Sequence, residues 1–355
     1  MVKIENKMGR KKMKALVLTD YKQMSYCSVP DPEISSNEVL VRVKSCGICG
    51  SDVHGYDGST GRRRPPVIMG HEASGIIEKI GSDVKNWVPG NRVTFDSTIY
   101  CNECDSCRKG YVNLCTNRKV IGVSCEDYRR DGAFAELIAI PQHILYRIPD
   151  NVTFDQAAMI EPLSVAFHAA NLAPHPLGVS AAVVGTGKIG MLLLQTLRMF
   201  GFGTIIAVKH SQNQSALIQK LGADYCFCTS TEDAVQCIND VTNGKGVDYV
   251  FEAAGNEKTI NLCIDICKRN GEIILVGNSS PKVTLPLQAI VTKQLHLSGS
   301  CASSGEYPAC LDAISHGSIN VDMLIGHRAP LSEGAYWFDK LYSNHEDNLK
   351  VILNP

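Results

Sequence analysis

The sequence predicts an α/β protein with a doubly wound parallel sheet in one domain and a β-rich, partly open barrel in the other. The first observation is a set of short strands bounded by turn residues before residue 160, and the second is an alternation of strands and helices after Pro162. The third is a glycine-rich turn at 185–190. A chain of 355 residues is long enough for two domains. We place these domains at 1–161 with 302–355, and at 162–301.

The β-rich domain is predicted from short runs of β-branched and apolar residues at 39–43, 75–80 and 91–95. Loops between such strands are places where side chains from distant parts of a sequence can converge. We expect the basic segment 1–12 to be a flexible tail and 349–353 to be a closing strand.

The second domain is predicted from strands and helices that alternate along the chain. Such alternation is typical of a parallel sheet with helices on both faces. After Ser300 the sequence becomes irregular again. The predicted strands are 181–184, 203–208, 247–252 and 271–277, and the predicted helices are 189–200, 211–221 and 257–269.

Composition excludes several classes of function. The net charge is −1 and the pI is near 6.8, so no general attraction to nucleic acid or to a membrane is expected. No apolar run reaches the roughly 18 to 20 residues of a membrane-spanning helix. The N-terminus lacks the apolar core of a secretory signal. We therefore interpret the fifteen cysteines as reduced thiols or metal ligands, and expect a cytoplasmic protein.

The turn Gly185-Thr186-Gly187-Lys188-Ile189-Gly190 lies between a predicted strand and a predicted helix. In that context Gly185 makes the tight turn, Gly187 lets the backbone approach a pyrophosphate, and Gly190 allows close packing of helix on strand. The pyrophosphate then meets the free N–H groups at the start of the helix, those of Lys188 and Ile189 included. The sequence therefore predicts a Rossmann-type dinucleotide site.

The carboxylate expected about twenty residues after this turn is missing. In NAD sites an acidic residue accepts hydrogen bonds from the ribose, but no Asp or Glu occurs between Glu161 and Asp224. Lys209 and Ser211 follow the second strand instead, and together they could bind a 2′-phosphate. We therefore predict NADP(H) in preference to NAD(H). The alternative is that Lys209 points to solvent and that NAD(H) is used without the acid.

Four cysteines, spaced C-x2-C-x2-C-x7-C, form a complete ligand set for one zinc ion. A site with four thiolates leaves no position for water, so it holds a loop and does not catalyse. The predicted structural zinc ligands are Cys101, Cys104, Cys107 and Cys115.

A second group of soft and borderline ligands lies upstream of these cysteines. Cys49 offers a thiolate and His71 an imidazole, and both stand beside glycine-rich turns. Glu72 and Glu161 are candidate carboxylate ligands, and Cys46 is a competing thiol. Catalytic zinc sites keep one position open, so three of these residues would suffice.

These motifs, in this order, resemble the zinc-containing medium-chain dehydrogenase/reductase family, from about Met13 to Pro355. The resemblance implies a Rossmann cofactor domain and a GroES-like catalytic domain. The stretch 161–164 (Glu-Pro-Leu-Ser) is similar to the sorbitol (polyol) dehydrogenase branch, and 129–136 resembles a stretch found in sugar-alcohol and sugar-acid dehydrogenases. The matching motifs are Gly47-Ile48-Cys49-Gly50-Ser51-Asp52, Gly70-His71-Glu72, the four-cysteine run, Glu161-Pro162-Leu163-Ser164 and the glycine turn.

The resemblance also implies roles for residues. Cys49 and His71 would bind a catalytic zinc, with Glu72 ranked ahead of Glu161 as the third ligand. Ser51 would hydrogen-bond the substrate oxygen, and His54 would pass its proton to solvent. The implied reaction is hydride transfer between a secondary alcohol of a polyol or sugar derivative and a nicotinamide cofactor.

Several alternatives remain open at this stage. Arg62-Arg63-Arg64 could steer an anionic sugar derivative toward the site, or could be a solvated loop. An L-threonine-type dehydrogenase would use the same scaffold, whereas a non-catalytic NADPH-binding protein would keep zinc only for structure. A redox or zinc-sensing regulator would use Cys46 and Cys49 as a thiol pair. The family resemblance also implies a homo-oligomer, either a tetramer or a dimer.

Overall fold

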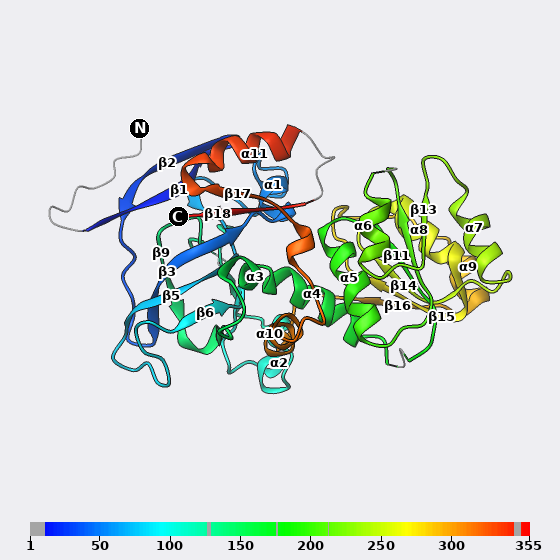
Figure 1. Ribbon diagram of the computed structural model, residues 1–355, viewed down its shortest axis with the longest axis horizontal. Helices are drawn as coiled ribbons and strands as arrows, with labels where there is room; N and C mark the ends of the chain where they lie inside the picture. The colour runs from blue at the N-terminus through cyan, green and yellow to red at the C-terminus, as the bar shows by residue number, and fades with distance from the viewer. Residues whose placement is uncertain (1–10, 126–128, 175–176, 212, 344–348) are drawn as a thin grey trace. The chain divides into compact units, whose positions relative to one another are not determined.

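The computed structural model describes residues 11–125, 129–174, 177–211, 213–343 and 349–355. The chain divides into two compact units, of which the first is Met1–Glu161 with Ile325–Pro355 and the second is Pro162–Leu324 (Figure 1). Most of the tail expected at 1–12 lies outside the described residues, and the first strand begins at Lys12.

The first unit is β-rich, as predicted, and most of its strand pairs are antiparallel. The order of its largest sheet is β10-β6-β5-β3-β18-β17, with β9 paired to β3; a second sheet has the order β2-β1-β4, and β7 pairs with β8. The strands expected at 39–43, 75–80 and 91–95 lie within β3, β5 and β6. The strands are β1 (Lys12–Asp20), β2 (Gln23–Pro30), β3 (Glu38–Gly47), β4 (Val67–Ile68), β5 (Glu72–Ile80), β6 (Arg92–Phe95), β7 (Thr98–Ile99), β8 (Lys119–Val120), β9 (Leu137–Pro141), β10 (Leu145–Arg147), β17 (Ile325–Pro330) and β18 (Lys350–Asn354).

Alternation along β3 shows why the sheet forms. Val41 and Val43 are buried, whereas Arg42 and Lys44 between and after them are exposed, as the two-residue period of a strand requires. The inward side chains join one core with Phe95, Phe134 and other apolar residues. The helices of this unit are α1 (Gly50–Gly55), α2 (Asp105–Arg108), α3 (Phe154–Ala158) and α11 (Gly334–Ser343).

The C-terminal strand β18 lies beside the end of β3, antiparallel to it, with Ile352 opposite Gly47. The amide of Ile48 donates a hydrogen bond of 2.9 Å to the carbonyl of Val351. This pairing brings Lys350, at the start of β18, close to the loop that carries Cys49.

The second unit contains the predicted doubly wound sheet, whose six parallel strands run in the order β13-β12-β11-β14-β15-β16. The chain passes from β11 outward to β13 and then returns to the other side of β11, so β11 lies at the topological switch point where such folds bind ligands. The strands are β11 (Ala181–Val184), β12 (Ile205–Lys209), β13 (Tyr225–Cys228), β14 (Val247–Glu252), β15 (Cys267–Leu275) and β16 (His296–Gly299), and the helices are α4 (Ile160–Asn171, which begins in the first unit), α5 (Lys188–Met199), α6 (Ser215–Lys220), α7 (Ala234–Val241), α8 (Glu257–Ile266), α9 (Leu287–Lys293) and α10 (Tyr307–Ser315).

Several expected boundaries in this part of the chain differ from the structure. Helix α8 ends at Ile266 rather than at 269, because Cys267 pairs with Val247 as the first residue of β15. Helix α6 begins at Ser215 rather than at 211. The chain returns to the first unit at Ile325 rather than at 302, because α10 packs in the second unit, where Glu306 forms an ion pair of 2.7 Å with His168.

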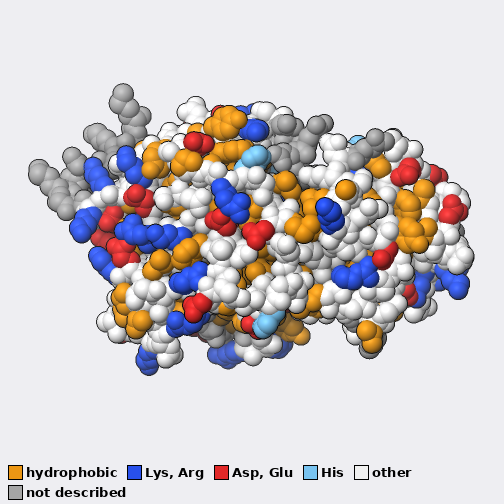
Figure 2. Space-filling view, viewed as in Figure 1, with side chains coloured by type: hydrophobic (Ala, Val, Ile, Leu, Met, Phe, Trp, Pro, Cys, Tyr) orange, Lys and Arg blue, Asp and Glu red, His pale blue; other side chains and the backbone are white. Residues whose placement is uncertain are grey.

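On the face drawn in Figure 2, Lys and Arg side chains are interspersed with Asp and Glu side chains. Among the described residues, no helix is both long and apolar enough to cross a lipid bilayer.

Candidate active site and metal centres

The four cysteines of the predicted structural site converge in the lobe between β7 and β8. The Sγ atoms of Cys101, Cys104, Cys107 and Cys115 all lie within 4.8 Å of one another. Four thiolates around one zinc ion would stand about 3.8 Å apart, given Zn–S bonds of about 2.3 Å in a tetrahedron. The separation of 4.0 Å between the sulfurs of Cys101 and Cys107 is close to that value.

Backbone amides in this lobe favour thiolates. The amide of Cys104 donates to Cys101 Sγ at 3.4 Å, and the amide of Cys101 donates to Cys115 Sγ at 3.3 Å. Hydrogen bonds from the amides of Cys107 and Thr116 lower the pKa of Cys104 to about 6. Because zinc binds the deprotonated thiol, the lobe fits a metal ion chemically as well as geometrically.

The second predicted group also converges. Ligand atoms of Cys49, His71 and Glu72 lie within 4.8 Å of one another. Cys49 is the N-cap of α1, and His71 and Glu72 stand where the chain enters β5. Gly70, which precedes His71, has φ of +93°, and a Cβ there would lie 2.9 Å from Cys46 Sγ. Glycine is therefore required at this position, because it alone combines the left-handed conformation with the close approach.

His71 and Glu72 in this group are buried, Cys49 is half-buried, and two of the ligand atoms lack a hydrogen-bond partner among the described residues. His71 Nδ1 and Glu72 Oε1 are buried and have no hydrogen-bond partner among the described residues. Burial alone would lower the pKa of His71, but the charges of Asp52 and Cys49 raise it well above its ordinary value. A bound cation would give His71 Nδ1 and Glu72 Oε1 the partner that each of them lacks. A thiolate with an imidazole and a carboxylate is a donor set that zinc accepts.

Glu72 is engaged on its other side. Its Oε2 accepts a hydrogen bond of 2.5 Å from Lys350 Nζ, and both side chains are 1% exposed. Burial alone would lower the pKa of Lys350, but Glu72 raises it above its ordinary value. Gly47 makes this approach possible, since a Cβ there would lie 2.5 Å from Glu72 Oε2.

Glu161, the other candidate carboxylate, lies near the start of α4 and accepts a hydrogen bond of 2.9 Å from Ser97 Oγ. Burial raises its pKa; His71 opposes that rise, and the charge of Glu72 adds to it. Among the described residues, the set of ligand atoms within 4.8 Å of one another contains Glu72 and not Glu161. The geometry therefore favours Glu72 as the third ligand, with Glu161 in its vicinity.

Ser51 and His54 lie on α1, and both are exposed. Ser51 donates from its amide and from Oγ to Cys49 Sγ, at 3.4 and 3.3 Å. His54 follows Ser51 by one helical turn, on the same side of the helix. The helix start therefore holds the Cys49 sulfur and the Ser51 hydroxyl together.

The glycine turn has the geometry that each glycine was predicted to need. Gly185 has φ of +98°, and a Cβ on Gly190 would lie 1.9 Å from the Gly185 carbonyl oxygen. A Cβ on Gly187 would meet nothing within 4 Å, so the backbone there faces open space at the N-terminus of α5. Lys188 and Ile189 begin that helix. This open, amide-lined surface fits a pyrophosphate.

Comparison with known proteins identifies the family of this chain. The family model for the alcohol dehydrogenase GroES-like domain matches residues 35–150, and that for zinc-binding dehydrogenases matches 189–316. A D-arabitol-phosphate dehydrogenase of Enterococcus avium is 33% identical over 94% of this chain and 95% of its own. A sorbitol dehydrogenase of Bacillus subtilis (strain 168) is 30% identical over 97% of both chains. The structure of a zinc-binding dehydrogenase from Sinorhizobium meliloti 1021, solved with NADP bound, is similar to this chain with a TM-score of 0.89. The two are 32% identical, and the match covers 98% of this chain and 100% of the other.

This chain belongs to the zinc-containing medium-chain dehydrogenase family, in its sorbitol dehydrogenase-like branch. It is therefore an oxidoreductase enzyme, as predicted, and its two units are the GroES-like and Rossmann domains of that family.

Three charged residues of the dehydrogenase contact this site but were not predicted from the sequence as site residues. They are Asp52, Arg63 and Lys350. Asp52 is fully buried and lies 2.9 Å from Arg63 Nη2 and 3.5 Å from His71 Nδ1. Burial alone would raise the pKa of Asp52, but His71 and Arg63 hold it well below its ordinary value. Arg63 is 3% exposed, so it is not part of a solvated basic loop. No residue type or spacing signalled these contacts, because charged residues are usually exposed.

Lys209 of the dehydrogenase does not point into solvent. It is 5% exposed, and its Nζ donates to the carbonyl of Asn213 at 2.9 Å and to Ser215 Oγ at 2.5 Å. Both of these acceptors are neutral. Ser211, the second predicted residue of this subsite, is exposed on the same loop.

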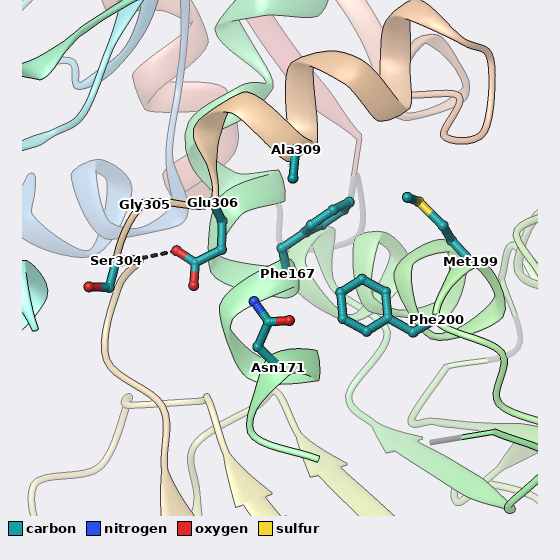
Figure 3. A pocket seen from close by; sticks show the side chains of 8 residues that line it. All are labelled: Phe167, Asn171, Met199, Phe200, Ser304, Gly305, Glu306 and Ala309. Atoms are coloured by element: carbon teal, nitrogen blue, oxygen red, sulfur yellow. Dashed lines mark hydrogen bonds between the residues drawn. The ribbon is translucent and has the colours of Figure 1, made fainter. Parts of the chain in front are cut away.

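A separate cavity of about 350 Å³ lies within the Rossmann unit (Figure 3). The Phe167 and Phe200 rings meet edge to face in it, 5.4 Å apart, and Glu306 accepts a hydrogen bond from the amide of Ser304. Its lining contains none of the residues predicted to bind metal or dinucleotide.

Proposed function

We propose that this enzyme oxidises a secondary alcohol of a polyol or sugar derivative, or reduces the corresponding ketone, with zinc and a nicotinamide cofactor. The observation that carries this proposal is the cluster of half-buried Cys49 with buried His71 and Glu72, in which the Ser51 hydroxyl lies 3.3 Å from the Cys49 sulfur. Relatives named for arabitol phosphate and sorbitol support a polyol substrate. A regulator that uses a Cys46 and Cys49 thiol pair is less favoured, because burial raises the pKa of Cys46 well above its ordinary value.

In this proposal the chain holds two zinc ions. Cys101, Cys104, Cys107 and Cys115 would hold one for structure. Cys49, His71 and Glu72 would hold the other, which supplies Lewis-acid polarisation of the substrate oxygen when bound. Ser51 would hydrogen-bond that oxygen and take its proton, and the exposed His54, one turn along α1, would pass the proton to water. Gly185, Gly187, Lys188, Ile189 and Gly190 would hold the cofactor pyrophosphate.

We infer a preference for NADP(H) over NAD(H). The Lys209 ammonium is nearly buried, and within the described part of the chain it forms hydrogen bonds to two neutral acceptors and no ion pair. A buried charge without a counter-charge is unfavourable. A 2′-phosphate beside Lys209 and Ser211 would supply that counter-charge. The S. meliloti relative solved with NADP supports the same cofactor.

We also propose that the enzyme works in a reducing cytoplasm and assembles as a homo-oligomer, a dimer or tetramer. No disulfide joins cysteines in the described part of the chain, which suits a reducing compartment. The oligomer is proposed from the family resemblance.

The test is a substrate screen with both cofactors, read as nicotinamide absorbance. Polyols, sugar acids and polyol phosphates are compared with L-threonine at one pH and low salt. We expect turnover with polyol-type substrates and a higher kcat/KM with NADP. Lys209→Asp should shift the cofactor ratio toward NAD by at least about tenfold, since it exchanges a phosphate partner for a ribose partner. Activity on L-threonine alone would support an L-threonine-type dehydrogenase instead. A higher kcat/KM of the wild-type enzyme with NAD than with NADP would contradict the inferred cofactor preference.

A further inference from the structure

Arg63 is a buried member of an exposed basic run. Its neighbours Arg62 and Arg64 are exposed, whereas Arg63 is 3% exposed. Its Nε and Nη2 donate to Asp52 Oδ1 at 3.3 and 2.9 Å, and Nη2 also donates to Ser51 Oγ at 3.3 Å. One guanidinium therefore contacts both Ser51 and Asp52, in the first turn of α1.

The fold makes room for this guanidinium. Gly55 is the last residue of α1, and a Cβ there would lie 2.4 Å from Arg63 Cγ. The missing side chain lets the Arg63 stem pack under the helix. Removing a guanidinium from water is unfavourable unless it is paired, and the fully buried Asp52 provides the pair. The Ser51 contact is additional to that pair, and a mere ion pair would not require it.

The contact restricts what the Ser51 hydroxyl can do. A hydroxyl has one proton to donate and two acceptor positions, and a guanidinium can only donate. Arg63 therefore occupies an acceptor position of Ser51 Oγ and leaves its proton free to point elsewhere. In the structure that proton has Cys49 Sγ as its acceptor, at 3.3 Å.

We propose that Arg63 is a positioning residue that holds Ser51 as a hydrogen-bond donor to the substrate alkoxide, the form that the oxygen takes once its proton has passed through Ser51 to His54. This inference rests on the proposed function, in which Ser51 contacts that oxygen. With one of its two acceptor positions filled by a cationic donor, Ser51 uses the other for the substrate proton and then presents a proton toward the oxygen, which carries negative charge. Donors that are oriented before the reaction stabilise such charge more than donors that must reorganise.

The experiment compares Arg63→Gln and Arg63→Lys with wild type, each alone and combined with Ser51→Ala, in zinc-loaded enzyme. The control is Arg42→Gln, which removes an exposed arginine paired with Glu78 in the same unit. We measure zinc content, kcat and KM, and the Kd of dimethyl sulfoxide for the complex with reduced cofactor, from nicotinamide fluorescence. The sulfoxide oxygen can only accept hydrogen bonds, so its affinity reports the Ser51 donor without turnover.

Arg63→Gln should keep zinc, lower kcat by about 10- to 100-fold and weaken sulfoxide binding, as expected for one hydrogen bond from a charged donor. KM should change less than kcat. In the Ser51→Ala background the same substitution should change kcat by less than about threefold, because residues that act together are not additive. Arg63→Lys should retain the ion pair with Asp52 and zinc but lose most of kcat, since an ammonium on a shorter chain does not also reach Ser51.

Additive losses in the double variant, or unchanged kcat and sulfoxide affinity in zinc-loaded Arg63→Gln, would overturn the proposal. Loss of zinc from both single variants would overturn it too, because Arg63 would then only support the metal site. Absence of wild-type turnover on every alcohol would refute the proposed function instead, and the sulfoxide measurement would still test the Arg63 contact.

Discussion

At the scale of single residues, the candidate ligands Cys49, His71 and Glu72 lie among buried charges that form ion pairs. Lys350 and Glu72 are both 1% exposed and lie 2.5 Å apart. Each would be costly to bury alone, since the desolvation penalty of an unpaired charge is several kcal/mol. The pair holds Glu72 Oε2, so that Oε1 is the carboxylate oxygen left without a partner. Lys350 thereby sets the direction in which Glu72 faces.

Lys350→Met should therefore destabilise the protein strongly. It leaves the Glu72 carboxylate buried without a counter-charge, which costs roughly 3–5 kcal/mol in comparable cases. Lys268→Met is the matched control, because Lys268 pairs with Asp248 while 39% of its side chain is exposed, and such pairs contribute about 1 kcal/mol or less. The measurement is urea unfolding with zinc content determined in parallel. Equal effects of the two substitutions would mean that burial does not control the strength of the Glu72 pair.

Residue types and their spacing were sufficient to predict which candidate ligands lie together, but not what surrounds them. Cys49, His71 and Glu72 stand in short local motifs, and the structure brings them together. Lys350 reaches Glu72 across 278 positions of the sequence, and nothing local to either residue signals that contact. Arg63 stands in a run of three arginines, from which the sequence predicted either a steering role or a solvated loop, and nothing in that run indicated that its middle member is buried.

At the scale of elements, the turn from β11 to α5 assigns a different task to each glycine. Gly190 lies against backbone, since a Cβ there would be 1.9 Å from the Gly185 oxygen. Gly187 faces open space, with nothing within 4 Å of a Cβ. One glycine is therefore required by the fold, and the other is left free for a ligand.

Alanine at these two positions should separate folding from cofactor binding. Gly187→Ala should melt like wild type but raise the cofactor Kd by more than about tenfold, because the methyl group occupies the space for the pyrophosphate. Gly190→Ala should also lower stability, by about 1–3 kcal/mol, because helix and strand must move apart. Thermal melting and nicotinamide fluorescence titration measure the two effects. Wild-type affinity in Gly187→Ala would show that the pyrophosphate does not approach this turn.

Elements were predictable where a local pattern was strong and where tertiary pairing agreed with it. The apolar run of β11 and the periodicity of α5 both match the structure closely. The end of α8 was not predictable from local sequence, because Cys267 joins strand β15 through its pairing with Val247 and not through its own conformational propensity. The segment after Ser300 contains α10, whose place is fixed by distant partners such as His168.

At the scale of the whole molecule, the two proposed zinc ions have different relations to the fold. The cysteine lobe spans 101–115, and the two short strands β7 and β8 flank it. The four cysteine sulfurs converge inside this lobe. Removal of its metal should loosen the lobe. The Cys49 cluster, by contrast, is set in a sheet core with its own ion pairs, so that region should fold without metal.

Single-cysteine variants should therefore lose the same amount of zinc with different consequences. Wild type should contain two zinc ions per chain, and Cys49→Ala and Cys104→Ala should each contain one. Cys49→Ala should abolish turnover while melting close to wild type, because it removes only the proposed catalytic ligand. Cys104→Ala should lower the melting temperature, because the lobe loses its metal cross-link. Cys27→Ala, outside both clusters, is the control and should retain both ions. Metal analysis and thermal melting decide the matter: one ion in wild type, or two in Cys104→Ala, would contradict the division into a structural and a catalytic zinc.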